Sequence, residues 1–203
     1  MKDSKDVQPT PDSSDAKGAV QGNTTDKTTA KRRTVAFGDK KMIEVEVAFI
    51  SIDATMGTPI LFLREKVGEP KYMLPIWIRQ AEAQAIQWQL KGEMPPRPMT
   101  HDLMKNIIEQ LGAKVTAVCV HSLADATYFG QINIEADGHH LEVDARSSDA
   151  VALGLRFNAP IYVSEEIIQE TGFPETDLKE AEKQEAKNVL ESLDEDALGR
   201  YTV

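Results

Sequence analysis

Residues 42–50, with the sequence MIEVEVAFI, alternate apolar and polar side chains at a period of two. Successive side chains of an extended strand point to opposite faces, so this stretch predicts a strand with one buried face. A turn-forming segment at residues 57–59 ends the pattern, and apolar strands are predicted again at residues 60–63 and 72–78. Strands separated by short turns favour hairpins and a largely antiparallel sheet.

The apolar period becomes helical after these strands. Residues 80–92 predict a helix that ends at Gly92, and the proline-rich residues 94–98 cannot continue it. A second helix is predicted from Thr100, as its N-cap, to a stop at Gly112. Its apolar stripe, expected to face inward, consists of Leu103, Ile107 and Leu111.

The second half of the domain alternates strands with two further helices. The predicted elements are strands at residues 115–121, 127–135, 139–144 and 159–163, and helices that begin at Ser147 or Ser148 and at Ser164. Because hairpins and helices are mixed without a regular βαβ alternation, the predicted class is α+β. We expect a single domain with a mixed, largely antiparallel sheet of hairpins and three or four packed helices.

Composition divides the chain into three parts. Residues 1–41 have almost no aliphatic side chains and predict a disordered N-terminal arm. Residues 42–174 form the predicted α+β domain, which is long enough to bury a core without metals or disulfides. Residues 175–203 carry four basic and nine acidic groups and predict an acidic C-terminal helical tail.

The composition also restricts the class of protein. The chain has 203 residues and a net charge of −10, which disfavours binding to nucleic acid by charge alone. A single cysteine, Cys119, excludes a disulfide framework, and no apolar run reaches the ~20 residues that a membrane-spanning helix needs. The start of the chain has no apolar stretch typical of a signal peptide, so we expect a cytoplasmic protein without membrane contact.

Ionisable residues gather at the predicted helix starts, where free backbone N–H groups favour anions. The candidate catalytic residues are Glu82, His101, Asp144 and Asp149. Asp144 and Asp149 are also the candidate ligands of a Mg²⁺ or Mn²⁺ ion, and His101 is the candidate general base. The candidate substrate-binding residues are Arg97, Arg146 and Ser148.

A structural role for the same residues is the competing interpretation. Aspartate at a helix start is favoured by capping and by the helix dipole alone, and Arg146 with Asp149 can form a simple ion pair. His101 can serve as a hydrogen-bond donor to a backbone carbonyl. We expect Trp77 and Trp88 to belong to the core or an interface rather than to a base-stacking surface.

The same segments resemble the bifunctional nuclease domain family of bacterial and plant proteins with DNase and RNase activity. The matching stretches are Leu74-Pro75-Ile76-Trp77-Ile78, Glu82-Ala83, Pro96-Arg97-Pro98-Met99-Thr100-His101-Asp102-Leu103, Val143-Asp144-Ala145-Arg146-Ser147-Ser148-Asp149-Ala150 and Ala159-Pro160-Ile161. The chain departs from the family at Arg79 and Ala126, where glycine is usual, and at Ser147, where proline is usual. The resemblance implies an α+β fold, a homo-oligomer and nuclease activity.

Two functions follow as hypotheses. The first is a metal-assisted nuclease that hydrolyses DNA and RNA, in which binding of nucleic acid is weak and salt-dependent because the domain is acidic. The alternative is a non-enzymatic, oligomeric module that binds a small anionic ligand or a partner protein at the same helix starts.

Overall fold

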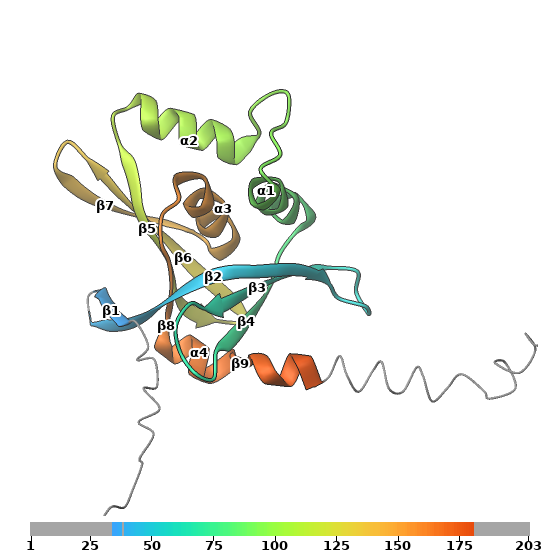
Figure 1. Ribbon diagram of the computed structural model, residues 1–203. Helices are drawn as coiled ribbons and strands as arrows, with labels where there is room; N and C mark the ends of the chain where they lie inside the picture. The colour runs from blue at the N-terminus through green and yellow to red at the C-terminus, as the bar shows by residue number, and fades with distance from the viewer. Residues whose placement is uncertain (1–33, 38, 181–203) are drawn as a thin grey trace, which may run out of the picture.

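The computed structural model describes residues 34–37 and 39–180, and within them one nine-stranded sheet organises the chain (Figure 1). The strands are β1 (Thr34–Phe37), β2 (Lys40–Ile52), β3 (Pro59–Glu65), β4 (Tyr72–Trp77), β5 (Lys114–Ala124), β6 (Thr127–Ala136), β7 (His139–Arg146), β8 (Ile161–Ser164) and β9 (Phe173–Pro174). The helices are α1 (Gln80–Lys91), α2 (Thr100–Gln110), α3 (Ser147–Phe157) and α4 (Glu165–Thr171), and residues 175–180 are also helical.

The sheet order is β7-β6-β5-β8-β2-β3-β4-β9, and β1 pairs with β2. Among the described strands, β5 and β8 pair in parallel and the other neighbours pair antiparallel. Asp137 and Gly138 both have positive φ, which is the geometry of a tight hairpin turn between β6 and β7. The predicted α+β class, with a mixed and largely antiparallel sheet, is confirmed.

Ordered structure begins earlier than the predicted boundary at residue 42. Strand β1 and the first residues of β2 fall within residues 34–41, which composition assigns to the disordered arm. Their backbone groups pair with each other, from Thr34 opposite Ile43 to Phe37 opposite Lys40. The rest of the arm, residues 1–33, and the tail from residue 181 lie outside the described residues.

Helix α3 is the centre of the core. Ala150, Val151, Ala152 and Leu153 are fully buried, and the helix contacts α1, α2, β5 and β6. In Figure 1, α1, α2 and α3 lie above strand β2, and α4 lies below it. A helix that is apolar around most of its circumference is typical of such a central position.

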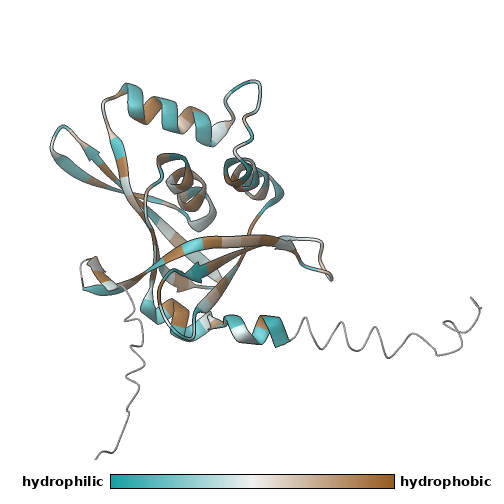
Figure 2. Cartoon of the chain, in the orientation of Figure 1, coloured by the Kyte–Doolittle hydropathy of each residue, from teal (hydrophilic) through white to brown (hydrophobic). Residues whose placement is uncertain are grey.

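Helix α2 does not bury the stripe that its sequence predicts. Leu103, Ile107 and Leu111 are 52%, 49% and 74% exposed, and the neighbouring Met104 and Ile108 pack against the core instead. The apolar face of α2 is wide enough to offer two stripes, and α3 takes the one formed by Met104 and Ile108. Figure 2 shows apolar segments along α2 among polar ones at the surface of the molecule.

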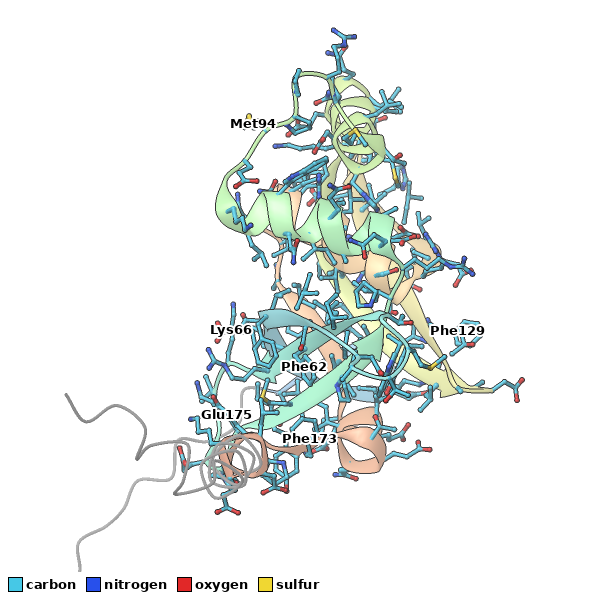
Figure 3. The ribbon with its side chains drawn as sticks, turned by 90° about the vertical axis from the view of Figure 1, so that its right-hand side faces the viewer. Phe62, Lys66, Met94, Phe129, Phe173 and Glu175 are labelled. Atoms are coloured by element: carbon cyan, nitrogen blue, oxygen red, sulfur yellow. The ribbon has the colours of Figure 1, made fainter. Side chains whose placement is uncertain are left out.

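Aromatic side chains attach strand β9 to the rest of the sheet. Phe62 of β3 stacks on Phe49 of β2. Phe62 also meets Phe173 of β9 edge-on, and both of these residues are labelled in Figure 3. The adjacent Glu175 forms an ion pair with Arg64. These contacts fix the chain as it leaves the sheet at β9.

Two further observations concern the sequence-based exclusions. No helix in residues 34–37 and 39–180 is both long and apolar enough to cross a membrane. Cys119 is a buried free thiol, and burial raises its pKa to about 11. A buried thiol in this position behaves as a small apolar side chain.

The close contact between α3 and β5 gives a stability test. A Cβ atom at Gly154 would lie 2.7 Å from Cγ2 of Val118, a stiff β-branched side chain. Glycine to alanine normally stabilises a helix interior, but here overpacking outweighs that gain, and we expect Gly154→Ala to lower the free energy of unfolding by about 1–3 kcal/mol. Urea denaturation measures the change. The added variant Val118→Ala should restore part of the loss, and a stabilised Gly154→Ala protein would show that the packing is looser than described.

Candidate functional site

The first turns of α1, α2 and α3 meet around a pocket of about 210 Å³, which we call the helix-start pocket. Its lining residues are Ala81, Glu82, Gln84, Ala85, Trp88, Met99, Thr100, His101, Arg146 and Asp149. The pocket forms because β7 leads directly into α3 without a linker, so that Arg146 is at once the last residue of the strand and the N-cap of the helix. Four of the predicted site residues, Glu82, His101, Arg146 and Asp149, line this pocket.

Arg146 connects two carboxylates in this pocket. Its Nη2–H group donates to Oε1 of Glu82, and its Nε–H group donates to Oδ2 of Asp149 at 2.7 Å. Hydrogen bonds to Asp149 and then Glu82 raise the pKa of Arg146, so the guanidinium is permanently charged. Its Nη1 atom has no partner among the described residues, and the side chain is 57% exposed. One edge of the guanidinium is therefore held while the other faces solvent.

His101 shares the second oxygen of Asp149. Its Nε2 atom lies 3.0 Å from Oδ1 of Asp149, and the imidazole side chain is 8% exposed. When Nε2–H donates this hydrogen bond to the carboxylate, Nδ1 is the acceptor nitrogen of the neutral ring. Glu82, His101, Arg146 and Asp149 thus form one hydrogen-bonded group, which we call the Arg146 cluster.

Glu82 keeps one oxygen without a partner. The residue is 6% exposed, and its Oε2 atom has no hydrogen bond within the described part of the chain. A buried carboxylate oxygen without a donor is costly in the folded protein. This atom marks the place in the Arg146 cluster where a bound cation, water or ligand donor would be most favourable.

A second ion pair fixes the opposite end of α3. The buried Arg156 donates from Nε to Oδ1 of Asp102 at 2.6 Å and from its other nitrogens to the carbonyls of Ala152 and Ala85. Burial alone would raise the pKa of Asp102, but hydrogen bonds from Arg156 and from the Met99 backbone N–H lower it below its ordinary value. This pair holds α2, and with it His101, against α1 and α3.

The remaining predicted residues lie outside the Arg146 cluster. Asp144 is exposed on β7 opposite Gln131, and it does not line the helix-start pocket. Arg97 is exposed in the segment between α1 and α2 and also lies outside the pocket. Ser148 is buried at the start of α3 and lines a neighbouring pocket that shares Arg146. Neither Ser147 nor Ser148 is the N-cap of α3, contrary to the prediction from the sequence, because the N-cap position is occupied by the preceding residue, Arg146.

This placement bears on the predicted metal ion. No group of three or more His, Cys, Asp or Glu residues within the described chain is arranged to hold a metal. Both oxygens of Asp149 are already engaged, and Asp144 is not beside them. Oε2 of Glu82 is the carboxylate oxygen of the Arg146 cluster that is left for a cation, and Asp144 and Asp149 do not form a cage for one.

Sequence reasoning gave no role to Asp102 and Arg156. Asp102 stands three residues after Met99 and is recognisable as a first-turn carboxylate. Arg156 gives no such signal, because a basic residue in the last turn of a helix is ordinarily a solvated partner of the dipole. Its burial follows from the three-helix packing and cannot be read from local pattern.

Comparison with known proteins identifies related chains. The profile of the bifunctional nuclease domain matches residues 61–176, which include the whole Arg146 cluster. Uncharacterized proteins from two strains of Mycobacterium tuberculosis are 37% identical over 164 residues, which cover 76% of this chain and 97% of theirs. Bifunctional nuclease 1 of Oryza sativa subsp. japonica and a bifunctional nuclease of Oryza minuta are 24% identical over 103 residues, 49% of this chain and 31% of the plant proteins.

The pair of Asp102 and Arg156 gives a pH-dependent stability test. Because the folded pKa of Asp102 is depressed, the pair stabilises the protein fully above the unfolded pKa of about 3.9 and loses this effect as the pH falls through the folded value. We expect Asp102→Asn to cost roughly 2–4 kcal/mol at pH 7, since it leaves a buried guanidinium without its anion. Urea unfolding from pH 3 to pH 7 should show that the difference from wild type narrows below about pH 4.

The exposed Glu93 provides the control for this test, and Glu93→Gln should change stability by less than about 0.5 kcal/mol. A difference between wild type and Asp102→Asn that stays constant across the pH range would contradict the described ion pair.

Proposed function

The chain belongs to the bifunctional nuclease domain family, and on that premise we propose that it hydrolyses phosphodiester bonds of DNA and RNA at the Arg146 cluster. The observation that supports this site is the pairing of a buried His101 with Asp149 beside a guanidinium that faces solvent. In this proposal His101 is the proton acceptor and Arg146 is the phosphate-binding group. Both lie in the helix-start pocket and within the residues that match the family profile.

His101 is the general base in this proposal. Asp149 holds the imidazole through Nε2, so that Nδ1 accepts a proton from the attacking water. The water oxygen forms a bond to phosphorus, the bond from phosphorus to the leaving sugar oxygen breaks, and that oxygen is protonated by the imidazolium or by solvent. Asp149 stabilises the charged imidazolium throughout.

Arg146 binds the phosphate. Glu82 and Asp149 hold its Nη2 and Nε groups, which leaves Nη1 free to donate to a phosphate oxygen. An arginine that is already oriented loses little side-chain entropy on binding. Glu82 therefore acts as a positioning residue for Arg146, and its Oε2 atom is the proposed ligand of Mg²⁺ or Mn²⁺. When bound, such an ion polarises a phosphoryl oxygen.

The acidic character of the chain limits this activity. The net charge of −10 repels a polymer of phosphates at long range, so we expect weak binding of nucleic acid that depends strongly on salt. A cytoplasmic location, with Cys119 reduced, belongs to the same proposal.

Cleavage assays test the proposed activity. Labelled DNA and RNA, single- and double-stranded, are incubated at low salt with Mg²⁺, Mn²⁺ or EDTA, using protein purified through two orthogonal steps. We expect metal-dependent cleavage, and His101→Ala should lower kcat by roughly 10²- to 10⁴-fold because the general base is lost. His140→Ala, which removes an exposed histidine of β7 outside the pocket, is the matched control and should cleave like wild type.

The outcomes separate the hypotheses. Equal cleavage by wild type and His101→Ala would place the activity elsewhere or in a contaminant. Loss of cleavage in Asp144→Asn would show that the Asp144 carboxylate takes part in the reaction. No cleavage by any folded protein would contradict the nuclease and favour the alternative, a non-enzymatic module that binds an anionic ligand or a partner protein.

We also infer that the protein forms a homo-oligomer through α2. Met99, Leu103, Ile107 and Leu111 form a stripe along this helix and are 45–74% exposed. Large apolar side chains gathered on one helix face are typical of a surface that is covered in an assembly. The stripe begins at Met99, which also lines the helix-start pocket, so a second copy seated on it would narrow the entrance to the Arg146 cluster.

Light scattering during size-exclusion chromatography measures the oligomer. We expect a mass that is a multiple of 22.5 kDa for wild type and a shift towards the monomer for Ile107→Glu, because a charge is buried at the interface. Gln87→Glu adds the same charge on the exposed face of α1 and should leave the mass unchanged. A monomeric wild-type protein at micromolar concentration would contradict the inference.

A further inference from the structure

A second pocket, of about 230 Å³, adjoins the Arg146 cluster, and we call it the Trp77 pocket. It lies where three segments meet: the end of β4 with the start of α1, the turn between β5 and β6, and the junction of β7 with α3. The lining residues are Ile76, Trp77, Ile78, Arg79, Ala126, Thr127, Tyr128, Arg146, Ser147 and Ser148. Arg146 belongs to both pockets and forms the boundary between them.

One arginine of the Trp77 pocket, Arg79, adds a positive charge beside the Arg146 cluster. Among the described residues that line the pocket, Arg79 and Arg146 carry charge and none is acidic. The charge of Arg146 is balanced by Glu82 and Asp149, whereas Arg79 has no ion pair with a described residue. Arg146 and its two carboxylates together have a net negative charge. The positive charge of Arg79 offsets this negative charge and favours the approach of an anion.

The start of α3 adds donors to the same pocket. Arg146 is the N-cap residue of α3, and no side chain caps the helix. The first backbone N–H groups of the helix, at Ser147 and Ser148, therefore have no side-chain acceptor there. The guanidinium of Arg79 together with these amides forms a suitable environment for a phosphate group.

Trp77 presents an aromatic surface beside these donors. Trp77 is 54% exposed at the end of β4, so of the two places expected for it, the core or an interface, the core is excluded. Its Nε1–H group donates to Oδ2 of Asp53 at 3.2 Å, and the Thr55 and Met56 backbone N–H groups hold Oδ1 of Asp53. The turn between β2 and β3 thus fixes the orientation of the ring although much of it is in contact with water.

We propose that the Trp77 pocket is a binding subsite for single-stranded nucleic acid, in which Arg79 and the start of α3 bind a backbone phosphate and Trp77 stacks on an adjacent base. A base in a duplex is covered on both faces by its neighbours, so only an unpaired base can lie on the indole ring. Stacking accepts any base, and a phosphate is common to DNA and RNA. The choice of substrate rests on the proposed nuclease function, but binding at this subsite does not require turnover.

The subsite directs the strand toward the Arg146 cluster. Because Arg146 faces both pockets, a phosphate bound on the Arg79 side leaves the neighbouring phosphodiester beside the helix-start pocket, where His101 and Asp149 lie. The Trp77 pocket thereby supplies affinity that the acidic surface does not.

Fluorescence anisotropy with a labelled 12-nucleotide oligothymidylate and a 12-base-pair duplex tests the subsite. The full chain is used in EDTA, so that binding is measured without metal-dependent cleavage. We expect tighter binding of the single strand, an affinity loss of about fivefold or more in Arg79→Gln, and a salt slope that falls by about 0.7, the value for one phosphate contact on a single strand. Lys91→Gln removes an equal charge at the other end of α1 and should bind within about twofold of wild type.

The aromatic contact has its own pair of variants. Trp77→Leu removes the stacking surface and should weaken binding by about tenfold, whereas Trp77→Phe keeps a ring and should retain most of the affinity. Equal binding by Arg79→Gln, Trp77→Leu and wild type, together with normal cleavage, would overturn the subsite while the nuclease stands. The expected binding pattern without any cleavage would support the subsite and contradict the nuclease. Equal affinity for the single strand and the duplex would also overturn the proposed subsite.

Discussion

The ion pairs that Arg146 makes with Glu82 and Asp149 are the contacts on which the site depends. Through them the end of β7 and the start of α3 are attached to α1, and His101 of α2 joins through the second oxygen of Asp149. At the other end of α3, Arg156 makes the corresponding connection to Asp102. Helix α3 is therefore held by an arginine at each end, and its small central residues let it approach β5 closely. Both arginines position α2, so the orientation of His101 is a consequence of α3 packing.

This arrangement has an electrostatic cost for binding. The carboxylates that orient Arg146 also cancel its charge, and the chain as a whole is acidic. A phosphate must therefore be attracted by other groups. Arg79 and the uncapped start of α3 provide such groups on the opposite side of Arg146, and Trp77 offers a surface for a base. In the function that we propose, this separation of phosphate capture from the histidine–aspartate pair lets an acidic domain act on nucleic acid.

Local sequence pattern was sufficient for most of the fold. The alternation in β2, the hairpin turn at Asp137 and the glycine stops of the helices predicted the elements and their class. The pattern also brought Glu82, His101, Arg146 and Asp149 together correctly, because each stands in or beside a helix first turn.

Local sequence pattern failed where tertiary packing decides between alternatives. The wide apolar face of α2 gives no sign of which stripe α3 will cover, and nothing local distinguishes the buried Arg156 from a solvated one. Asp144 was predicted at the site because it lies on the same side of the strand as Arg146, and the structure places it exposed on β7, outside the lining of the helix-start pocket.

A crystal structure of the full chain with a non-hydrolysable single-stranded dinucleotide tests the central claim most directly, namely that the Arg146 cluster is the place where a phosphodiester is bound for cleavage. The account predicts a phosphate oxygen within hydrogen-bonding distance of the Nη1 atom of Arg146, with the phosphorus facing His101 and a base against Trp77. A nucleotide bound at another surface, with the pairs of Arg146 unchanged and the helix-start pocket without a phosphate, would contradict the account.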